Sequence, residues 1–178
     1  MATYVVDSRR SSIEFKVKHL MIATVSGCFK KFHATMKTST EDFVGASLVF
    51  SADVESLSTG VADRDSHLRS SEVFDCQKWP KIFFESTEVK KTSSWSYEII
   101  GNLTIKNISL PVTLLGTHNG VVTDCNGKIA HTFEMHGILS RKEFGLNFNV
   151  AGLGNSVLVD DAIRLFVKVV AAEAIDEQ

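Results

Sequence analysis

Strict alternation of apolar and polar residues runs through most of this chain. In SIEFKVKH (12–19), Ile13, Phe15 and Val17 alternate with charged residues, which is the period of a β-strand with one buried face. The same pattern predicts strands at 24–37, 44–57, 81–90, 96–106, 110–118, 128–141 and 161–174. The segment 44–57 would be one long strand of about 35 Å. Turn signals such as Asn119-Gly120 and Asn126-Gly127 separate the segments, so we expect about eight antiparallel strands.

Two stretches lack the two-residue period. In residues 56–75, Ser58 or Thr59 is a candidate N-cap of a helix and Ser70 of a second one. We therefore expect one or two short helices there. Residues 141–155 contain several glycines and asparagines and predict a loop. No repeat or linker interrupts the pattern, so residues 1–178 are predicted to form a single domain.

A sheet of eight long strands has two edges, and closure into a barrel removes both of them. We predict an all-β fold: an eight-stranded antiparallel barrel with the short helices covering one end. The alternation assigns a set of uncharged residues to its interior. These are Leu48, Phe50, Ile82, Phe84, Leu103, Ile105, Val112, Leu114, Phe133, Met135, Ile163, Leu165 and Val167. Such a barrel holds either packed side chains or one slender ligand, and the twelve phenylalanines fit both alternatives.

Composition narrows the function classes. The formal net charge is −2 and no basic stripe is present, which argues against nucleic acid as a partner. No apolar run approaches the roughly 20 residues that span a bilayer, and MATYVVDSRR lacks the features of a signal peptide. Three widely spaced cysteines, Cys28, Cys76 and Cys125, fit a reducing compartment. We expect a cytoplasmic protein that does not span a membrane, or a periplasmic one if the sequence is a mature chain.

The densest run of charge is DRDSHLRSSEVFD (63–75). On a helix Asp63 and His67 share a face, as a metal pair or a carboxylate-oriented base requires. Zinc needs three or four protein ligands, and the nearest further candidate is the thiol of Cys76. No nucleophile elbow or phosphate loop occurs elsewhere. The pattern predicts neither a metal site nor a catalytic residue.

The structural interpretation of this run is a lid over one end of the barrel. Its charged residues are expected to form local ion pairs and cap a short helix: Asp63, Arg64, Asp65, His67 and Arg69. Its apolar residues Leu68, Val73 and Phe74 would hold the helix against the barrel. Arg141 is predicted to pair with an aspartate of this lid.

Other candidates lie outside the run. His19 follows the inward parity of Ile13, Phe15 and Val17, so it either is a buried core histidine or contacts a ligand head group at the barrel end. His131 and His136 should face opposite sides of their strand, and His33 and His118 are expected in solvent at strand ends. Phe144, Leu146 and Phe148 lie in the predicted loop and form either a core satellite or a flap over a tunnel mouth.

Four segments, YVVDSRRSSIEFKVKHLMIATVSGCFKKF, RDSHLRSSEVFDCQKWPKIFFES, GNLTIKNISLPVTL and SRKEFG, resemble the YceI-like polyisoprenoid-binding family in order and spacing. The resemblance covers essentially the whole chain. It implies a lipocalin-like barrel whose tunnel holds a long isoprenoid chain, no cofactor, no established catalytic activity and, in many members, a homodimer. Two positions depart from the family pattern, because Arg10 follows Asp7 where histidine is usual and Ser140 stands where asparagine precedes the arginine.

We therefore expect a protein that binds a long-chain isoprenoid lipid, such as a polyprenyl chain or an isoprenoid quinone, as carrier, store or chaperone. The residues expected to line the tunnel are Ile13, Phe15, Val17, His19, Leu48, Phe50, Leu68, Val73, Phe74, Ile82, Phe84, Leu103, Ile105, Leu114, Phe133, Met135, Phe144 and Leu165. Two alternatives stay open: a hydrolase or metal-dependent enzyme that uses Asp63, Asp65 and His67, and a solid barrel that serves as an interaction module.

Overall fold

Strands make up most of the described part of the chain. The computed structural model describes residues 1–19, 23–123, 126–147 and 159–175. The strands within these residues are β1 (Ala2–Val6), β2 (Ser12–His19), β3 (Ala23–Phe29), β4 (Phe32–Thr38), β5 (Ser47–Asp53), β6 (Leu57–Ser58), β7 (Lys81–Lys91), β8 (Ser96–Ile105), β9 (Ile108–Thr123), β10 (Ile129–Ser140) and β11 (Val159–Glu173). A 3₁₀ turn, η1 (Val54–Ser56), and one α-helix, α1 (Ala62–Arg69), accompany them. No helix in these residues is long and apolar enough to cross a membrane.

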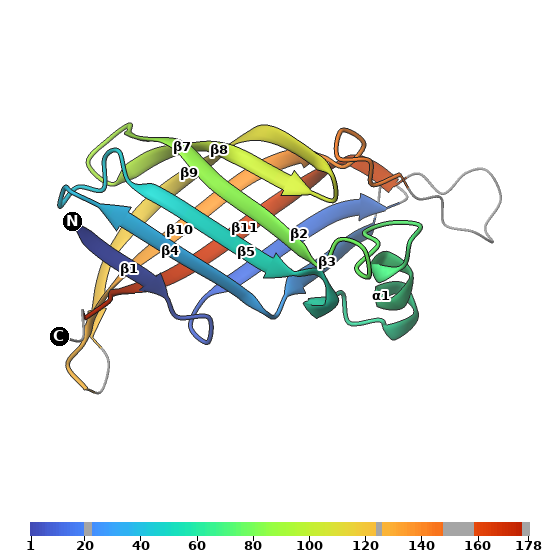
Figure 1. The fold of residues 1–178 in the computed structure, drawn as a ribbon, viewed down its shortest axis with the longest axis horizontal. Helices are drawn as coiled ribbons and strands as arrows, with labels where there is room; N and C mark the ends of the chain where they lie inside the picture. The colour runs from blue at the N-terminus through green and yellow to red at the C-terminus, as the bar shows by residue number, and fades with distance from the viewer. Residues whose placement is uncertain (20–22, 124–125, 148–158, 176–178) are drawn as a thin grey trace.

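The strands close into one antiparallel barrel, seen from the side in Figure 1. Neighbours follow the order β4-β5-β7-β8-β9-β10-β11, and β1 completes the ring by pairing with both β11 and β4. Further along β11 the partner is β2, which pairs in turn with β3. The eighth position of the barrel is thus shared by β1 at one end and β2 at the other. The predicted all-β, eight-stranded antiparallel barrel is confirmed.

The turn between β1 and β2 contains the first departure from the family pattern. The backbone N–H of Asp7 donates to the Val170 carbonyl at 2.8 Å, and the Val170 N–H donates to Ser11 Oγ at 2.9 Å. These bonds satisfy β11 where neither strand pairs with it. Arg10 Nε donates to Asp7 Oδ2 at 2.9 Å, and this bond holds the pKa of Asp7 below its ordinary value. Arg10 therefore stabilises the turn through a local ion pair.

Two of the predicted strands are wrong in extent. Residues 24–37 form two strands, β3 and β4, which turn a corner at Lys30 and Lys31 and pair with different neighbours. Two backbone hydrogen bonds hold the corner: the Lys30 N–H donates to the Ser56 carbonyl, and the Asp53 N–H donates to the Lys31 carbonyl. Residues 44–57 contain the short strand β5 and the first residue of β6 rather than one long strand, because the chain turns at η1, where the Val54 N–H donates to the Pro80 carbonyl. Apolar alternation continues across both corners, so the pattern alone does not show them.

The turn predicted at Asn119-Gly120 is also wrong, because β9 runs through it to Thr123. Gly120 has φ +93°, a conformation that glycine adopts without strain, and the pairing of β9 with β10 shifts register between His131 and Phe133. The strand β1 was not predicted. It is short, and its five residues ATYVV do not alternate.

The helix α1 covers one end of the barrel, as predicted, and lies far from both termini (Figure 1). Its N-cap is Val61 and carries no side-chain cap bond, so the caps predicted at Ser58 or Thr59 are wrong. Asp65 instead binds the segment before the helix: its Oδ1 accepts the Thr59 N–H at 2.8 Å and the Thr59 hydroxyl at 2.5 Å. Ser70 is the C-cap of α1, and turns, not a second helix, follow it.

Candidate functional site: an apolar tunnel in two chambers

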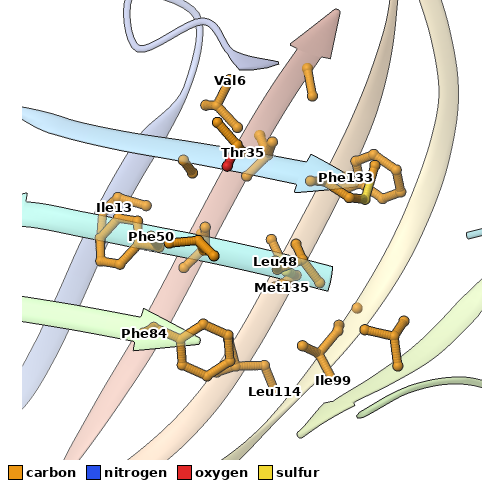
Figure 2. Close-up of a pocket in the computed structure, with 18 of the residues that line it drawn as sticks. Val6, Ile13, Thr35, Leu48, Phe50, Phe84, Ile99, Leu114, Phe133 and Met135 are labelled. Carbon is orange, nitrogen blue, oxygen red and sulfur yellow. The ribbon is translucent and has the colours of Figure 1, made fainter. Parts of the chain in front are cut away.

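The barrel interior is not filled by its side chains. Two cavities lie within it, and we call them the narrow chamber and the wide chamber. The narrow chamber, of about 150 Å³, lies toward the end that holds the chain termini, and Figure 2 shows its wall. The wide chamber, of about 560 Å³, lies under α1. Close-packed protein interiors contain few voids larger than a water molecule, so an interior this open has the size of a ligand site.

The wall of the narrow chamber is apolar on every side. Phe84 projects into it from β7, Leu114 from β9, and Phe133 and Met135 from β10 (Figure 2). Its full lining is Val6, Ile13, Phe32, Ala34, Thr35, Met36, Phe43, Leu48, Val49, Phe50, Phe84, Val89, Tyr97, Ile99, Leu103, Val112, Leu114, Gly116, Phe133, Met135, Leu165, Val167, Val169 and Ala171. A ligand here meets hydrocarbon and aromatic surface, which favours an apolar chain.

The wide chamber combines an apolar wall with a polar end. Phe15, Phe29, Phe74 and Leu139 are among its apolar lining residues. The polar groups come from the lid and from strand ends: His19, Thr59, Asp63, Arg64, His67 and Arg141. A molecule with a polar head and an apolar tail matches this distribution.

Four residues belong to the walls of both chambers: Ile13, Phe50, Leu103 and Leu165. They come from β2, β5, β8 and β11, which lie around the barrel. We call this set the constriction, because it is where the two chambers meet. A chain that occupies both chambers must pass it.

Two glycines set the position of aromatic rings in the wall. A Cβ atom built on Gly101 would collide with the ring of Phe84, and one built on Gly27 would collide with the ring of Phe15. The tip of each ring therefore occupies the space over a glycine of the neighbouring strand that a Cβ atom would otherwise fill. This keeps them out of the tunnel centre and leaves space for a ligand.

The predicted tunnel residues lie on these walls with one exception. Ile13, Phe50, Leu103 and Leu165 form the constriction, and the remaining residues divide between the chambers. Leu48, Phe84, Leu114, Phe133 and Met135 face the narrow one, and Phe15, Val17, His19, Leu68, Val73, Phe74, Ile82 and Ile105 face the wide one. Phe144 lines neither; it is 2% exposed and packs with Leu146 in the core. Phe148 lies outside the described residues. Contact of the wall residues with a lipid stays a prediction.

The two lid arginines bind backbone and hydroxyl groups, where ion pairs with the lid aspartates were expected. Arg64 donates to the Thr59 hydroxyl at 2.7 Å and to its carbonyl at 3.0 Å. Arg69 donates to the carbonyls of Asp65 and Glu55. His67 Nε2 lies 2.7 Å from a Glu72 oxygen. In the described residues, no three His, Cys, Asp or Glu side chains are grouped as a metal ion would require.

Arg141 is the most deeply buried arginine of the site, with 7% of its surface exposed. Its guanidinium donates to the carbonyls of Leu146, Val159 and Asp160 at 2.9 to 3.0 Å. These carbonyls hold it in place, whereas a carboxylate of the lid was expected to do so. The neighbouring Ser140 donates to Asp161 Oδ2 at 2.6 Å, which lowers the pKa of that carboxyl. The second departure from the family pattern thus anchors the start of this loop.

A cluster of rings that the sequence did not reveal borders the narrow chamber, and two of its members, Phe43 and Phe133, line the chamber wall. His118 Nε2 lies 3.0 Å from His131 Nδ1, and Tyr4, Phe43 and Phe133 pack edge-on or tilted against this pair. We call these five residues the aromatic plug. Burial lowers the pKa of both histidines. The prediction that His118 lies in solvent is wrong, because β9 extends past it and Trp95 covers it.

The closed antiparallel barrel with a helix at one end and two largely apolar chambers inside defines a β-barrel protein of the ligand-binding type. Residues 4–171 match the model of the YceI-like domain, and the chain belongs to this family. A UPF0312 protein of Staphylococcus epidermidis is 32% identical over 152 residues, which are 85% of this chain and 86% of the relative.

Two solved structures share the fold. Burkholderia cenocepacia BcnA superposes with a TM-score of 0.78 at 24% identity and covers 93% of this chain and 98% of its own. A polyisoprenoid binding domain from Saccharophagus degradans, implicated in plant cell wall breakdown, superposes with a TM-score of 0.68 at 11% identity, with 96% and 98% coverage. At these identities the likeness concerns the fold alone.

Proposed function

We propose that this protein binds a long-chain isoprenoid lipid, a polyprenyl chain or an isoprenoid quinone, and acts as its carrier, store or chaperone. The observation that carries the proposal is the pair of chambers with largely apolar walls that share the constriction residues. A solid barrel would show side chains packed across this space. The Saccharophagus domain named for polyisoprenoid binding shares the fold and supports the same ligand class.

The energetics suit an apolar tail. Each CH₂ group removed from water contributes about 0.8 kcal/mol, so one five-carbon isoprene unit contributes several kcal/mol. A few ordered units suffice for tight binding. A long tail cannot contribute in full, because non-covalent affinities end near −20 kcal/mol and ordering the tail opposes binding.

The polar end of the wide chamber gives the proposal a direction. Arg64 and His67 face this chamber from the lid, and Arg141 faces it from the start of the loop after β10. The narrow chamber has no such groups apart from a threonine and a tyrosine. The tail is therefore proposed to extend through the constriction toward the aromatic plug, with the head group under α1.

Mass spectrometry of lipid extracted from protein purified without detergent tests the proposal. We expect a lipid with isoprene repeats in near-stoichiometric amount, and reloading of the stripped protein with a long-tailed quinone. Adjacent residues of β9 provide a matched pair of variants: Leu114→Trp fills the narrow chamber, and Leu115→Trp adds the same ring on the outer face, where Leu115 is 47% exposed. Absence of long-chain lipid from the native protein together with failure to reload would refute the function.

A further inference from the structure

Exposed apolar side chains gather at the end of the barrel opposite α1. Six of them lie between 40% and 79% exposed: Val44, Trp95, Val121, Val122, Ile129 and Ile175. We call this set the apolar rim. Its members come from the β4–β5 connection, the β7–β8 turn, the ends of β9 and β10 and the residues after β11. Figure 1 shows these segments at the end that holds both termini.

Direct contacts tie the rim segments together around the aromatic plug. The Tyr97 hydroxyl donates to the Asp42 carbonyl at 2.9 Å, which fixes the β4–β5 connection to β8. The His118 N–H donates to the Trp95 carbonyl at 2.8 Å, and the two rings lie 5.8 Å apart. Phe43 and Phe133 belong both to the plug and to the wall of the narrow chamber. The rim therefore surrounds the point where the tunnel ends.

The charges around the rim have both signs. Lys37, Lys91 and Lys128 are exposed there, as are Glu41, Asp42 and Glu173. A partner surface with charge of a single sign would therefore meet both like and opposite charges at this end. The features that distinguish this end are apolar side chains on separate turns and an exposed tryptophan, and tryptophan prefers the boundary between water and lipid.

We propose that the apolar rim docks the barrel on the surface of a lipid bilayer. The inference rests on the proposed function, because a lipid tail that occupies the tunnel has the bilayer as its source or destination. Docking at this end places the tail end of the tunnel against the bilayer and leaves the polar end under α1, where the head group is proposed to lie, facing water. Separate apolar side chains on strand ends and connections insert into an interface without burying a strand edge.

The two tryptophans of the chain make the orientation measurable. Trp95 belongs to the rim, whereas Trp79 lies in the connection between the lid helix α1 and β7, where its backbone N–H donates to the Asp75 carbonyl. The probe is neutral phosphatidylcholine vesicles with brominated acyl chains, which quench tryptophan at membrane depth. We expect at least a twofold loss of fluorescence for Trp79→Phe, which retains Trp95, and little change for Trp95→Phe. Quenching of Trp79 instead, or of neither, would overturn the inference.

A matched pair on β10 separates docking from a general effect of charge. Ile129 at the rim is 58% exposed, and Ile138 near the lid end is 61% exposed on the same strand. Ile129→Asp should reduce vesicle flotation at least fivefold, whereas Ile138→Asp should leave it unchanged; equal loss in both would contradict the inference. Extraction of the same samples keeps the two proposals apart. If the protein contains lipid but does not bind vesicles, the docking proposal alone is refuted. If the protein contains no lipid, the proposed lipid-binding function is refuted.

Discussion

The two ends of the barrel differ in what their polar groups do. At the lid end, Arg64, Arg69 and Arg141 donate to backbone carbonyls or to a hydroxyl, so the first two hold the short helix in place and Arg141 holds the loop after β10. At the rim end, His118 and His131 lie among aromatic rings and have lowered pKa values. In the sequence, the lid is recognised by its density of charged residues. In the structure, the rim end is recognised by two histidines whose pKa values are lowered by burial.

The largest expected effect comes from separating the two chambers. Leu165→Trp at the constriction should reduce binding of long isoprenoid tails at least tenfold, because the indole blocks passage from the wide to the narrow chamber. Short tails should still bind in the wide chamber alone. Binding of quinones of increasing tail length measures this. The control is Phe166→Trp on the outer face of β11, where Phe166 is 39% exposed; equal loss there would show that the constriction does not control tail length.

The lid end should be sensitive to the shape of Arg141. Arg141→Lys should destabilise the fold by about 2 to 4 kcal/mol, because a single ammonium cannot serve three buried carbonyls that a guanidinium reaches. Denaturant unfolding measures the free energy. The control is Arg10→Lys at the exposed ion pair with Asp7, which should change stability by less than about 1 kcal/mol. Similar values for both variants would contradict the structural role of Arg141.

The rim end should make stability fall in mild acid. Burial lowers the pKa of His118 and His131, so below about pH 6.5 the unfolded chain takes up protons that the folded chain excludes. Unfolding free energy should drop by up to about 1.4 kcal/mol per pH unit for each such proton. This loss should end once pH passes the folded pKa values.

Denaturant titrations between pH 7.5 and 5 measure this window. Asp7, Asp42 and Asp161 have lowered pKa values, so their contributions are lost at more acidic pH, below about 4. The double variant His118→Gln with His131→Gln should flatten the slope, and comparison at pH 8 provides its reference. An unchanged slope would place the acid sensitivity outside the plug.

The smallest effect concerns the start of α1. Thr59→Val removes a hydroxyl that donates to Asp65 and accepts from Arg64, so we expect a loss of about 1.5 kcal/mol. Thermal unfolding measures it. Thr87→Val, at an exposed hydroxyl that bonds the Ile100 carbonyl at 3.3 Å, should stay within about 0.5 kcal/mol. A neutral Thr59→Val would show that Asp65 does not need this contact.

Much of the barrel wall could be predicted because one face of each strand is exposed to solvent, so that apolar and polar residues alternate along it. The segment 12–19 was predicted with the bounds that β2 has, and 81–90 differs from β7 by one residue. Parity also placed Leu103 and Leu165 correctly on the inner face. The corners at Lys30 and at Val54 could not be predicted, since alternation describes which face a side chain takes and not which strand is the neighbour.

The aromatic plug could not be predicted from the sequence, for a similar reason. His118 and His131 are thirteen residues apart, and the pair forms because β9 continues past Asn119-Gly120 with a register shift opposite it. Tyr4 reaches the pair from a strand that does not alternate. The contacts thus depend on register between strands, which no local pattern contains.

The sequence by itself determined that this protein is an all-β barrel with an uncharged inner face, because hydrophobic periodicity is a local property that each strand carries. Only the tertiary structure decided that the interior is divided into two chambers and that a cluster of rings lies at one end. It also decided that two glycines leave room for the rings of Phe15 and Phe84 on the barrel wall. These features depend on barrel closure and strand register. They bring together residues that are distant in the chain.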